Sequence, residues 1–388
     1  MSDASVLLEF LNRRAAQVAD PSELDPEDLI QEAISQAEIL VPELLQSLRR
    51  GAAERVVQRH NWAGAVRRGV AEDWVETLKS FDELLATSEE VHQRLLINMK
   101  SAFREKCADP DPVDEGPWLA GSGLKVVMLL STHARACRVA AEVAQLAYSG
   151  FADGAIARLR TLYEVMVIHA VLAVGSYEVC ERYHAYGAVE NLHHVRAHLV
   201  HASAIGSSIN YDEQIAEAER EVQEVCELYG SEIQRPYEWA RPMFPGKVGR
   251  LTFADLDTSV TDNQLRLIYR RGNHGVHAGA FMVLRSIDLE KSYFNPTRPS
   301  ARIEDFNLLM SGAATLVGVI SSVTARQVAA EYRMLDESFA VAVVDQAKKR
   351  VHEAIQRDAL RQNVGFAAPP FSGGSIDLVN PNLPKQRE

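Results

Sequence analysis

Apolar residues recur along this chain with the period of an α-helix. In residues 126–148, VVMLLSTHARACRVAAEVAQLAY, they stand three, four or seven positions apart, at Leu129, Ala136, Val139, Val143 and Leu146. This spacing places them on one face of a helix. No run alternates apolar and polar residues convincingly enough to predict a strand. The pattern predicts an all-α fold, an antiparallel helical bundle.

Two stretches predict helices inside the bundle. Residues 151–174, FADGAIARLRTLYEVMVIHAVLAV, are apolar on most helical faces but carry Arg158, Arg160 and Glu164. Such a helix should be central, with its charges turned toward one another or toward a cleft. Residues 303–334 predict a long apolar helix whose Asn, Gly, Ser and Thr residues favour a buried core position over a membrane span.

Local signals predict helix starts and connections. Asp25 and Pro26 suit the cap and first position of a helix, and Thr261 or Asp262 can cap another over 263–287. Residues 177–202 and 211–230 predict two further helices. The second is so charged that it should form a solvated antiparallel arm. Prolines and glycines make 235–250 a loop.

Composition divides the chain into five predicted parts. The run ADPDPVDEGP, 108–117, holds three prolines and four acids and predicts a linker. An N-terminal helical accessory region, 1–107, precedes it, and a helical core, 118–335, follows. A C-terminal helix over 336–360 and a Pro- and Gly-rich flexible tail, 361–388, complete the chain.

The net charge and the cysteines narrow the class of protein. A net charge of −12 argues against electrostatic binding of nucleic acid or of an anionic membrane over a large surface, but it does not exclude a local basic pocket. Four scattered cysteines without a CxxC pair predict reduced, mostly buried thiols. No secretory signal is visible in MSDASVLLEF, so we expect a cytoplasmic protein without membrane contact.

The stretch YRRGNHGVHAG, 269–279, concentrates unusual chemistry in a predicted helix. At 100° per residue one stripe carries Arg270, Asn273, His274 and His277, and Arg271 lies about a third of a turn away. Its three glycines each cost about 1 kcal/mol in a helix, so they imply close packing of another backbone or a local distortion.

These residue types suit cleavage of a phosphodiester without a metal. An arginine can bind the phosphate, a histidine can move a proton and an amide can orient the substrate. The alternative is a helix–helix contact, with glycines at the crossing and histidines satisfied by neighbours.

The stretch also carries two family resemblances. Arg271 and His277 have five residues between them, Arg270 and His277 have six, and GNHGVH, 272–277, resembles a phrase of the HEPN (higher eukaryotes and prokaryotes nucleotide-binding) superfamily. Over about 120–330 the chain resembles a bacterial all-helical family, the domain-of-unknown-function family numbered five-six-seven-seven. That resemblance rests on LRTLYE (159–164), YEWA (237–240) and YRRGNHGVHAG.

The HEPN resemblance implies a helical bundle and a metal-independent ribonuclease, without a cofactor. Many such domains are toxins or antiphage effectors, often with the active site across a homodimer and with an antitoxin or another protein partner. The resemblance gives His277 the role of general acid or base on the ribose 2′-hydroxyl. Arg270 or Arg271 would stabilise charge on phosphorus, and Asn273 would hold the geometry.

Arg160 and Glu164 would form the second wall of such a site. They stand four residues apart on the predicted central helix. The alternative for them is a buried structural ion pair, which requires good partners because burial removes both charges from water.

Metal binding is a weaker alternative. One face of a predicted helix carries carboxylate and imidazole at metal-ligand spacing, at Glu190, His194, His198 and His201. Three Glu-x-x-His pairs resemble those of di-iron bundles, with Glu142 and Glu164 as conceivable further ligands: Glu89–His92, Glu181–His184 and Glu190–His193.

The motifs of several enzyme classes are absent from the sequence. It has no P-loop, no GxGxxG after a strand, no GxSxG elbow and no HExxH, which removes NTPases, dinucleotide enzymes, α/β-hydrolases and zincins. The leading hypothesis is therefore an RNA-cleaving, HEPN-like effector. A non-catalytic helical interaction or scaffold module comes second, and a metal-binding, di-iron-like bundle third.

Overall fold

The structure is a computed structural model that describes residues 26–106, 121–205, 211–276, 303–332 and 337–362. Side chains of some residues near the ends of these ranges, Arg271 and His274 among them, lie outside the description. The described elements are all helices, which confirms the predicted all-α class. The predicted linker 108–117 lies outside the described residues.

The helices have the following bounds: α2 (Pro26–Asp73), α3 (Val75–Lys106), α4 (Gly121–Tyr148), α5 (Ala152–Val174), α6 (Tyr177–Ala204), α7 (Asp212–Tyr229), η3 (Ser231–Gln234), η4 (Glu238–Met243), α8 (Phe253–Val260), α9 (Asn263–Val276), α11 (Ile303–Tyr332) and α12 (Glu337–Arg361). Within the described part, one unit holds α2 up to Ala65 and the other begins at Val66. The helical core and the candidate site lie in this second unit.

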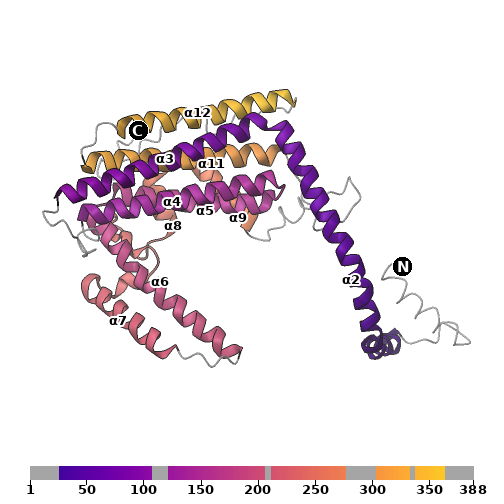
Figure 1. Ribbon diagram of the computed structural model, residues 1–388. Helices are drawn as coiled ribbons and strands as arrows, with labels where there is room; N and C mark the ends of the chain where they lie inside the picture. The colour runs from indigo at the N-terminus through magenta and orange to yellow at the C-terminus, as the bar shows by residue number, and fades with distance from the viewer. Residues whose placement is uncertain (1–25, 107–120, 206–210, 277–302, 333–336, 363–388) are drawn as a thin grey trace, which may run out of the picture. The chain divides into compact units, whose positions relative to one another are not determined.

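Long helices packed lengthwise make up the core of the second unit. Helix α11 packs against α3, α4, α5 and α12, and α4 packs against α5 (Figure 1). The turn between α4 and α5 is short because Gly150 adopts a left-handed backbone with φ of 79°. Helix α3, from the predicted N-terminal accessory region, is thus integrated with the predicted core.

Helix α11 lies at the centre of this arrangement. Every residue of 308–325 is buried. Within the described part of the chain it is the one helix long and apolar enough to cross a membrane, and its apolar stretch is entirely buried by the fold. Contact with four other helices accounts for its apolar sequence, as the prediction of a core helix requires.

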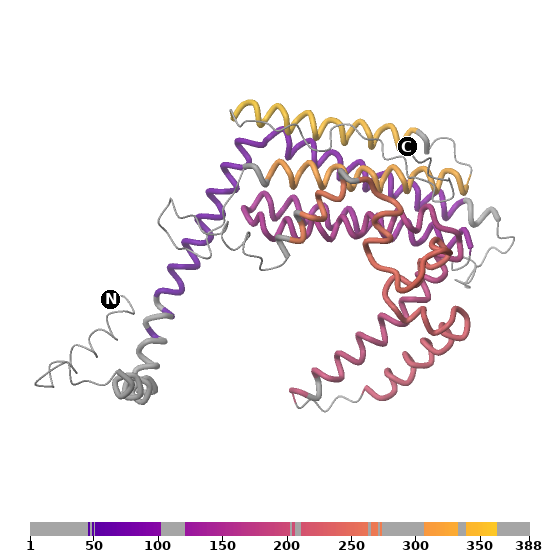
Figure 2. The backbone as a smooth tube through the Cα atoms, turned by 180° about the vertical axis from the view of Figure 1, so that it is seen from behind, coloured from indigo at the N-terminus to yellow at the C-terminus, as the bar shows by residue number. Residues whose placement is uncertain are grey.

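Helices α6 and α7 run alongside each other (Figure 2), and α6 also packs against α4 and η4. The charged helix α7 buries only Ala218 and Val222 among its residues. Arg196 of α6 donates a hydrogen bond to Glu219 of α7 across 2.7 Å. This geometry agrees with the predicted solvated arm.

Three buried histidines contact hydroxyl groups of α11. His133 of α4 lies 2.9 Å from the Ser321 hydroxyl, through Nε2. His169 of α5 lies 3.3 Å from the Thr324 hydroxyl. His352 of α12 lies 3.3 Å from both Ser311 and Thr315. These contacts satisfy polar groups that would otherwise be costly to bury, and they tie α11 to three neighbours.

Burial keeps these three imidazoles neutral. It lowers the pKa of His133 and of His169 to about 3, and for His133 repulsion from His169 and His92 acts in the same direction. Burial lowers the pKa of His352 to about 4, with a further lowering from Lys348. The folded protein therefore binds fewer protons than the unfolded chain between the ordinary histidine pKa of 6.5 and about pH 4.

We predict that acid destabilises the fold in this window. Stability is complete above about pH 6.5 and falls as the pH drops, by about 1.4 kcal/mol per pH unit for each of these histidines. Urea unfolding at several pH values between 7.5 and 4.5 measures the slope. His352→Gln keeps hydrogen-bonding groups but does not titrate, so it should make the slope shallower by that amount. An unchanged slope in this variant would contradict the interpretation.

Candidate functional site

Helix α9 carries the first part of the motif 269–279. Its start is fixed by Asp262, whose Oδ1 accepts a hydrogen bond from the Leu265 amide at 3.0 Å. This is the predicted cap. The description of α9 ends at Val276, so the remainder of the predicted helix lies outside it.

The structure describes only some of the side chains that were predicted to be catalytic in the motif 269–279. Arg270 is exposed and Asn273 is half-buried. The side chain of Arg271 and the whole of His277 lie outside the described residues. Arg270 and Asn273 are three residues apart and therefore share a face of the helix, as predicted.

Gly272 brings α9 into close contact with α5. A Cβ atom at Gly272 would lie 2.5 Å from the Cβ of Arg160, 3.2 Å from its Cγ and 3.3 Å from its Cα. No side chain other than hydrogen fits there without moving a helix. Of the two explanations left open for the glycines, close packing and a local distortion, the structure shows close packing at Gly272, which the alternative of a helix–helix contact also predicts.

The contact places Arg160 and Glu164 of α5 beside the motif. The Arg160 Nε donates to Glu164 Oε1 at 3.0 Å, and its Nη2 lies 3.5 Å from the hydroxyl of Tyr269. The guanidinium also lies 5.2 Å from the centre of the Tyr269 ring, within cation–π range. The two side chains predicted as the second wall are thus brought to α9.

The Arg160–Glu164 pair is only partly buried. The side chain of Arg160 is 20% exposed and that of Glu164 is 37% exposed. A purely structural pair was expected to be buried. The contacts of the described residues use two of the five N–H groups that a guanidinium offers, which leaves donors for an anion.

Tyr237 is the next residue of this cluster. Its pKa is raised by burial, by Glu164 and by Tyr269, while Arg160 lowers it, so these three side chains are its electrostatic neighbours. It is also the one non-glycine residue with a positive φ in the described part of the chain, at 67°. A tyrosine in this left-handed conformation is strained, and such strain is often found at functional sites.

A run of aromatic rings connects Tyr237 to α5. Ring centres are 6.2 Å apart between Tyr237 and Phe253, 5.1 Å between Phe253 and Tyr269, and 5.4 Å between Tyr269 and Tyr163. Tyr237, Phe253 and Tyr269 are half-buried, whereas Tyr163 is buried. The cluster of Arg160, Glu164, Tyr237, Phe253 and Tyr269 is called the α5–α9 site below.

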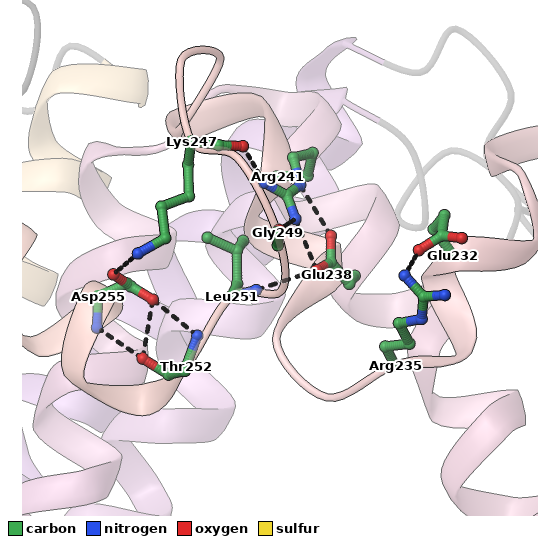
Figure 3. Close-up of polar contacts among 9 residues, drawn as sticks. All are labelled: Glu232, Arg235, Glu238, Arg241, Lys247, Gly249, Leu251, Thr252 and Asp255. Atoms are coloured by element: carbon green, nitrogen blue, oxygen red, sulfur yellow. Dashed lines mark hydrogen bonds and ion pairs between the residues drawn. The ribbon is translucent and has the colours of Figure 1, made fainter.

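A buried carboxylate holds the backbone next to Tyr237. Glu238 accepts two hydrogen bonds from Arg241, at 2.6 and 2.8 Å, and one from the Leu251 amide at 3.0 Å. Arg241 also donates to the carbonyl groups of Lys247 and Gly249, as Figure 3 shows. The predicted loop 235–250 is therefore an ordered element around η4, since this ion pair organises it despite its prolines.

Two polar anchors fix the rest of the site. The Thr252 hydroxyl and the Asp255 carboxylate cap α8 reciprocally, and Lys247 donates to Asp255 at 2.7 Å (Figure 3). This capping box positions Phe253, the first residue of α8. Beneath the rings, the Tyr163 hydroxyl donates to the buried Asp257 at 2.6 Å.

The carboxylates considered for a di-iron site have other partners. Glu142 pairs with Arg158, and Glu164 pairs with Arg160. Among the described residues no group of three or more His, Cys, Asp or Glu side chains is placed to hold a metal ion. Of the predicted set Glu190, His194, His198 and His201, the structure brings together His194 and His198, whose Nε2 atoms are 3.1 Å apart.

The three phrases behind the second resemblance converge at the α5–α9 site. Arg160 and Glu164 come from LRTLYE, Tyr237 comes from YEWA, and Tyr269 and Gly272 come from the motif 269–279. The tyrosines and Phe253 were not among the predicted site residues. The position of YEWA among prolines was a visible signal, but spacing within one helix cannot reveal contacts between different elements, such as that of Arg160 with Tyr269, 109 positions away.

Comparison with known families agrees with this grouping. The model of a family of unknown function, DUF5677, matches residues 126–294, which confirms over that segment the family predicted from the sequence. The matched segment contains the whole α5–α9 site. Neither the comparison with curated proteins nor that with solved structures gives a match.

We predict opposite effects for two Gly→Ala substitutions in helices. Gly272→Ala should lower the free energy of unfolding by about 1–3 kcal/mol, because the new methyl group overlaps the base of the Arg160 side chain, which cannot swing away. Gly187→Ala in α6 meets no atom within 4 Å and should raise it by about 0.5–1 kcal/mol. Urea unfolding measures both. Equal effects would show that the α5–α9 contact is not close.

Proposed function

We propose that the α5–α9 site binds a phosphodiester of RNA and that the protein cleaves RNA without a metal ion, as a toxin-type effector that acts against phage. The observation that carries this proposal is the contact of Gly272 with Arg160. It joins the arginine and carboxylate of α5 to the helix that carries Arg270 and Asn273, and in the sequence His277 directly follows the last described residue of that helix.

The proposed reaction uses the nucleophile that RNA itself contains. His277 accepts the proton of the 2′-hydroxyl, the 2′-oxygen attacks the adjacent phosphorus, and the bond to the 5′-oxygen breaks. The leaving oxygen takes up a proton, and the products are a 2′,3′-cyclic phosphate and a 5′-hydroxyl end. Arg160 and Arg270 or Arg271 would stabilise the negative charge that grows on the phosphate oxygens.

Glu164 and Asn273 would serve as positioning residues in this reaction. The carboxylate of Glu164 already fixes the Arg160 guanidinium through Nε, and the outer nitrogen Nη2 lies 3.5 Å from the Tyr269 hydroxyl of α9. A guanidinium held in place binds phosphate with two parallel hydrogen bonds and needs no reorientation. Asn273, half-buried on the same face of α9 as Arg270, would hold the ribose or phosphate.

The aromatic rings support a single-stranded substrate. Unpaired bases stack on tyrosine and phenylalanine rings, at about 1–3 kcal/mol for each base. Tyr237, Phe253 and Tyr269 are half-buried, and the ring of Tyr269 lies 5.2 Å from the Arg160 guanidinium. With a net charge of −12 the chain offers few phosphate contacts, so stacking would supply much of the affinity.

We predict that the purified full-length protein cleaves single-stranded RNA in the presence of EDTA and that His277→Ala abolishes the cleavage. The variant lacks the proton acceptor, so its rate should fall by a factor of about 10²–10⁴. His193→Ala, at an exposed histidine of α6, is the control and should keep the wild-type rate. Cleavage by His277→Ala at the wild-type rate, with an unchanged melting temperature, would refute the proposed mechanism.

We also predict that Arg160→Lys lowers kcat by a factor of about 10²–10³, with KM less affected. Lysine retains the aliphatic stem that packs beneath Gly272 and the positive charge, but loses the planar fork that stabilises the transition state. Arg158→Lys is the matched control on the same helix, where Arg158 pairs with Glu142. Equal activity of the two variants would remove Arg160 from the mechanism.

The alternative is a non-catalytic interaction module. Phe339 and Val343 stand one turn apart on α12 and are 73% and 53% exposed, which favours a protein contact on that face. The predicted homodimer, or an antitoxin or other protein partner, would use such a surface. If the protein cleaves no RNA but forms a stable complex with another protein, the interaction module is the explanation that remains.

We propose in addition that the protein is located in the cytoplasm. Burial raises the pKa of the Cys137 thiol to about 12 and that of Cys180 to about 11. Thiols with such pKa values react slowly, which suits a protein that keeps its cysteines reduced. The predicted absence of membrane contact is part of this proposal.

A further inference from the structure

The outer half of α6 presents two imidazoles that face each other. His194 and His198 are four residues apart, their Nε2 atoms are separated by 3.1 Å and their ring centres by 4.5 Å. Both side chains are exposed to solvent. They lie on the arm formed with α7 and take no part in the proposed cleavage of RNA.

The distance between the two nitrogen atoms fits a shared metal ion. Bonds from zinc to imidazole nitrogen are about 2.0–2.1 Å long, so nitrogens 3.1 Å apart subtend an angle of about 100° at the ion. This angle lies between the right angle of a square-planar complex and the tetrahedral angle, which copper and zinc prefer respectively. The same distance fits a hydrogen bond from one imidazole to the other, which a bound metal ion would replace.

The arginine that stands between the two histidines in sequence is directed elsewhere. Arg196 stands between the two histidines in sequence, but at 100° per residue it lies about 160° around the helix from each of them. Its guanidinium donates to Glu219 of α7 at 2.7 Å. The imidazole pair therefore faces away from α7, and the charge of Arg196 is compensated on the opposite side.

We propose that His194 and His198 form a bidentate site for a divalent late-transition-metal ion, Zn²⁺ or Cu²⁺. The site is distinct from a di-iron centre, because within the described part of the chain no third His, Cys, Asp or Glu side chain joins the pair. Water fills the other coordination positions in an isolated chain. The site belongs to the class of chelating histidine pairs in which an ion bridges one turn of a helix.

The test is a calorimetric titration of Zn²⁺ into tag-free, metal-free protein of full length. The wild-type protein should bind one ion per chain more than the double variant His194→Gln/His198→Gln. Each single variant should weaken that site at least tenfold, because one of two ligands is lost. His193→Gln, also exposed on α6, should bind like the wild type.

Electron paramagnetic resonance of the Cu²⁺-loaded protein gives a second readout. The wild-type spectrum should show hyperfine coupling to two imidazole nitrogens, and that of His198→Gln should show coupling to one at this site. Circular dichroism verifies that each variant remains helical. Identical stoichiometry and affinity in the wild type and the double variant would overturn the proposal, as would an equal loss in His193→Gln.

Discussion

The α5–α9 site depends on one steric condition, the absence of a side chain at Gly272. The stem of Arg160 occupies the space that a Cβ atom would need, at 2.5 Å. Glycine in a helix interior lowers stability by about 1 kcal/mol relative to alanine, so this cost must be offset by the contact that the close approach permits. What it permits is contact between the two helices at the level of Arg160, with its guanidinium against the ring of Tyr269.

Polar contacts inside the core determine how α11 sits among its neighbours. An apolar helix of 30 residues could slide or rotate against other apolar helices at little cost. The hydroxyls of Ser321, Thr324 and Thr315 meet imidazoles of three different helices, and a shift of one turn would separate each imidazole from its hydroxyl partner on α11. The register of α5 relative to α11, and through it the position of Arg160, is therefore specified by hydrogen bonds as well as by packing.

The sequence predicted what depends on local spacing. The helical class and the burial of α11 follow from periodicity and residue type, because each is decided within one or two turns. The sequence also narrowed the cap of α9 to Thr261 or Asp262 and left close packing as one of two explanations for Gly272, and the structure shows Asp262 and close packing. Integration of α3 with the core could not be predicted, because an apolar helix face does not reveal which helix covers it. Tyr237 was missed for a similar reason, since its neighbours stand 32 and 73 positions away, at Tyr269 and Glu164.

The strain at Tyr237 gives an independent reason to regard this region as more than scaffold. A left-handed backbone costs a residue with a side chain roughly 1–2 kcal/mol, and glycine or asparagine would adopt it more readily. The neighbouring carboxylate of Glu238, held by Arg241 and by the Leu251 amide, supplies the hydrogen bonds that keep the backbone in this conformation. If only the turn were needed, glycine would adopt this backbone conformation at a lower free-energy cost. The arrangement makes physical sense if the aromatic ring itself is required at the end of the run of rings, 6.2 Å from Phe253, because an unstrained chain would place it elsewhere.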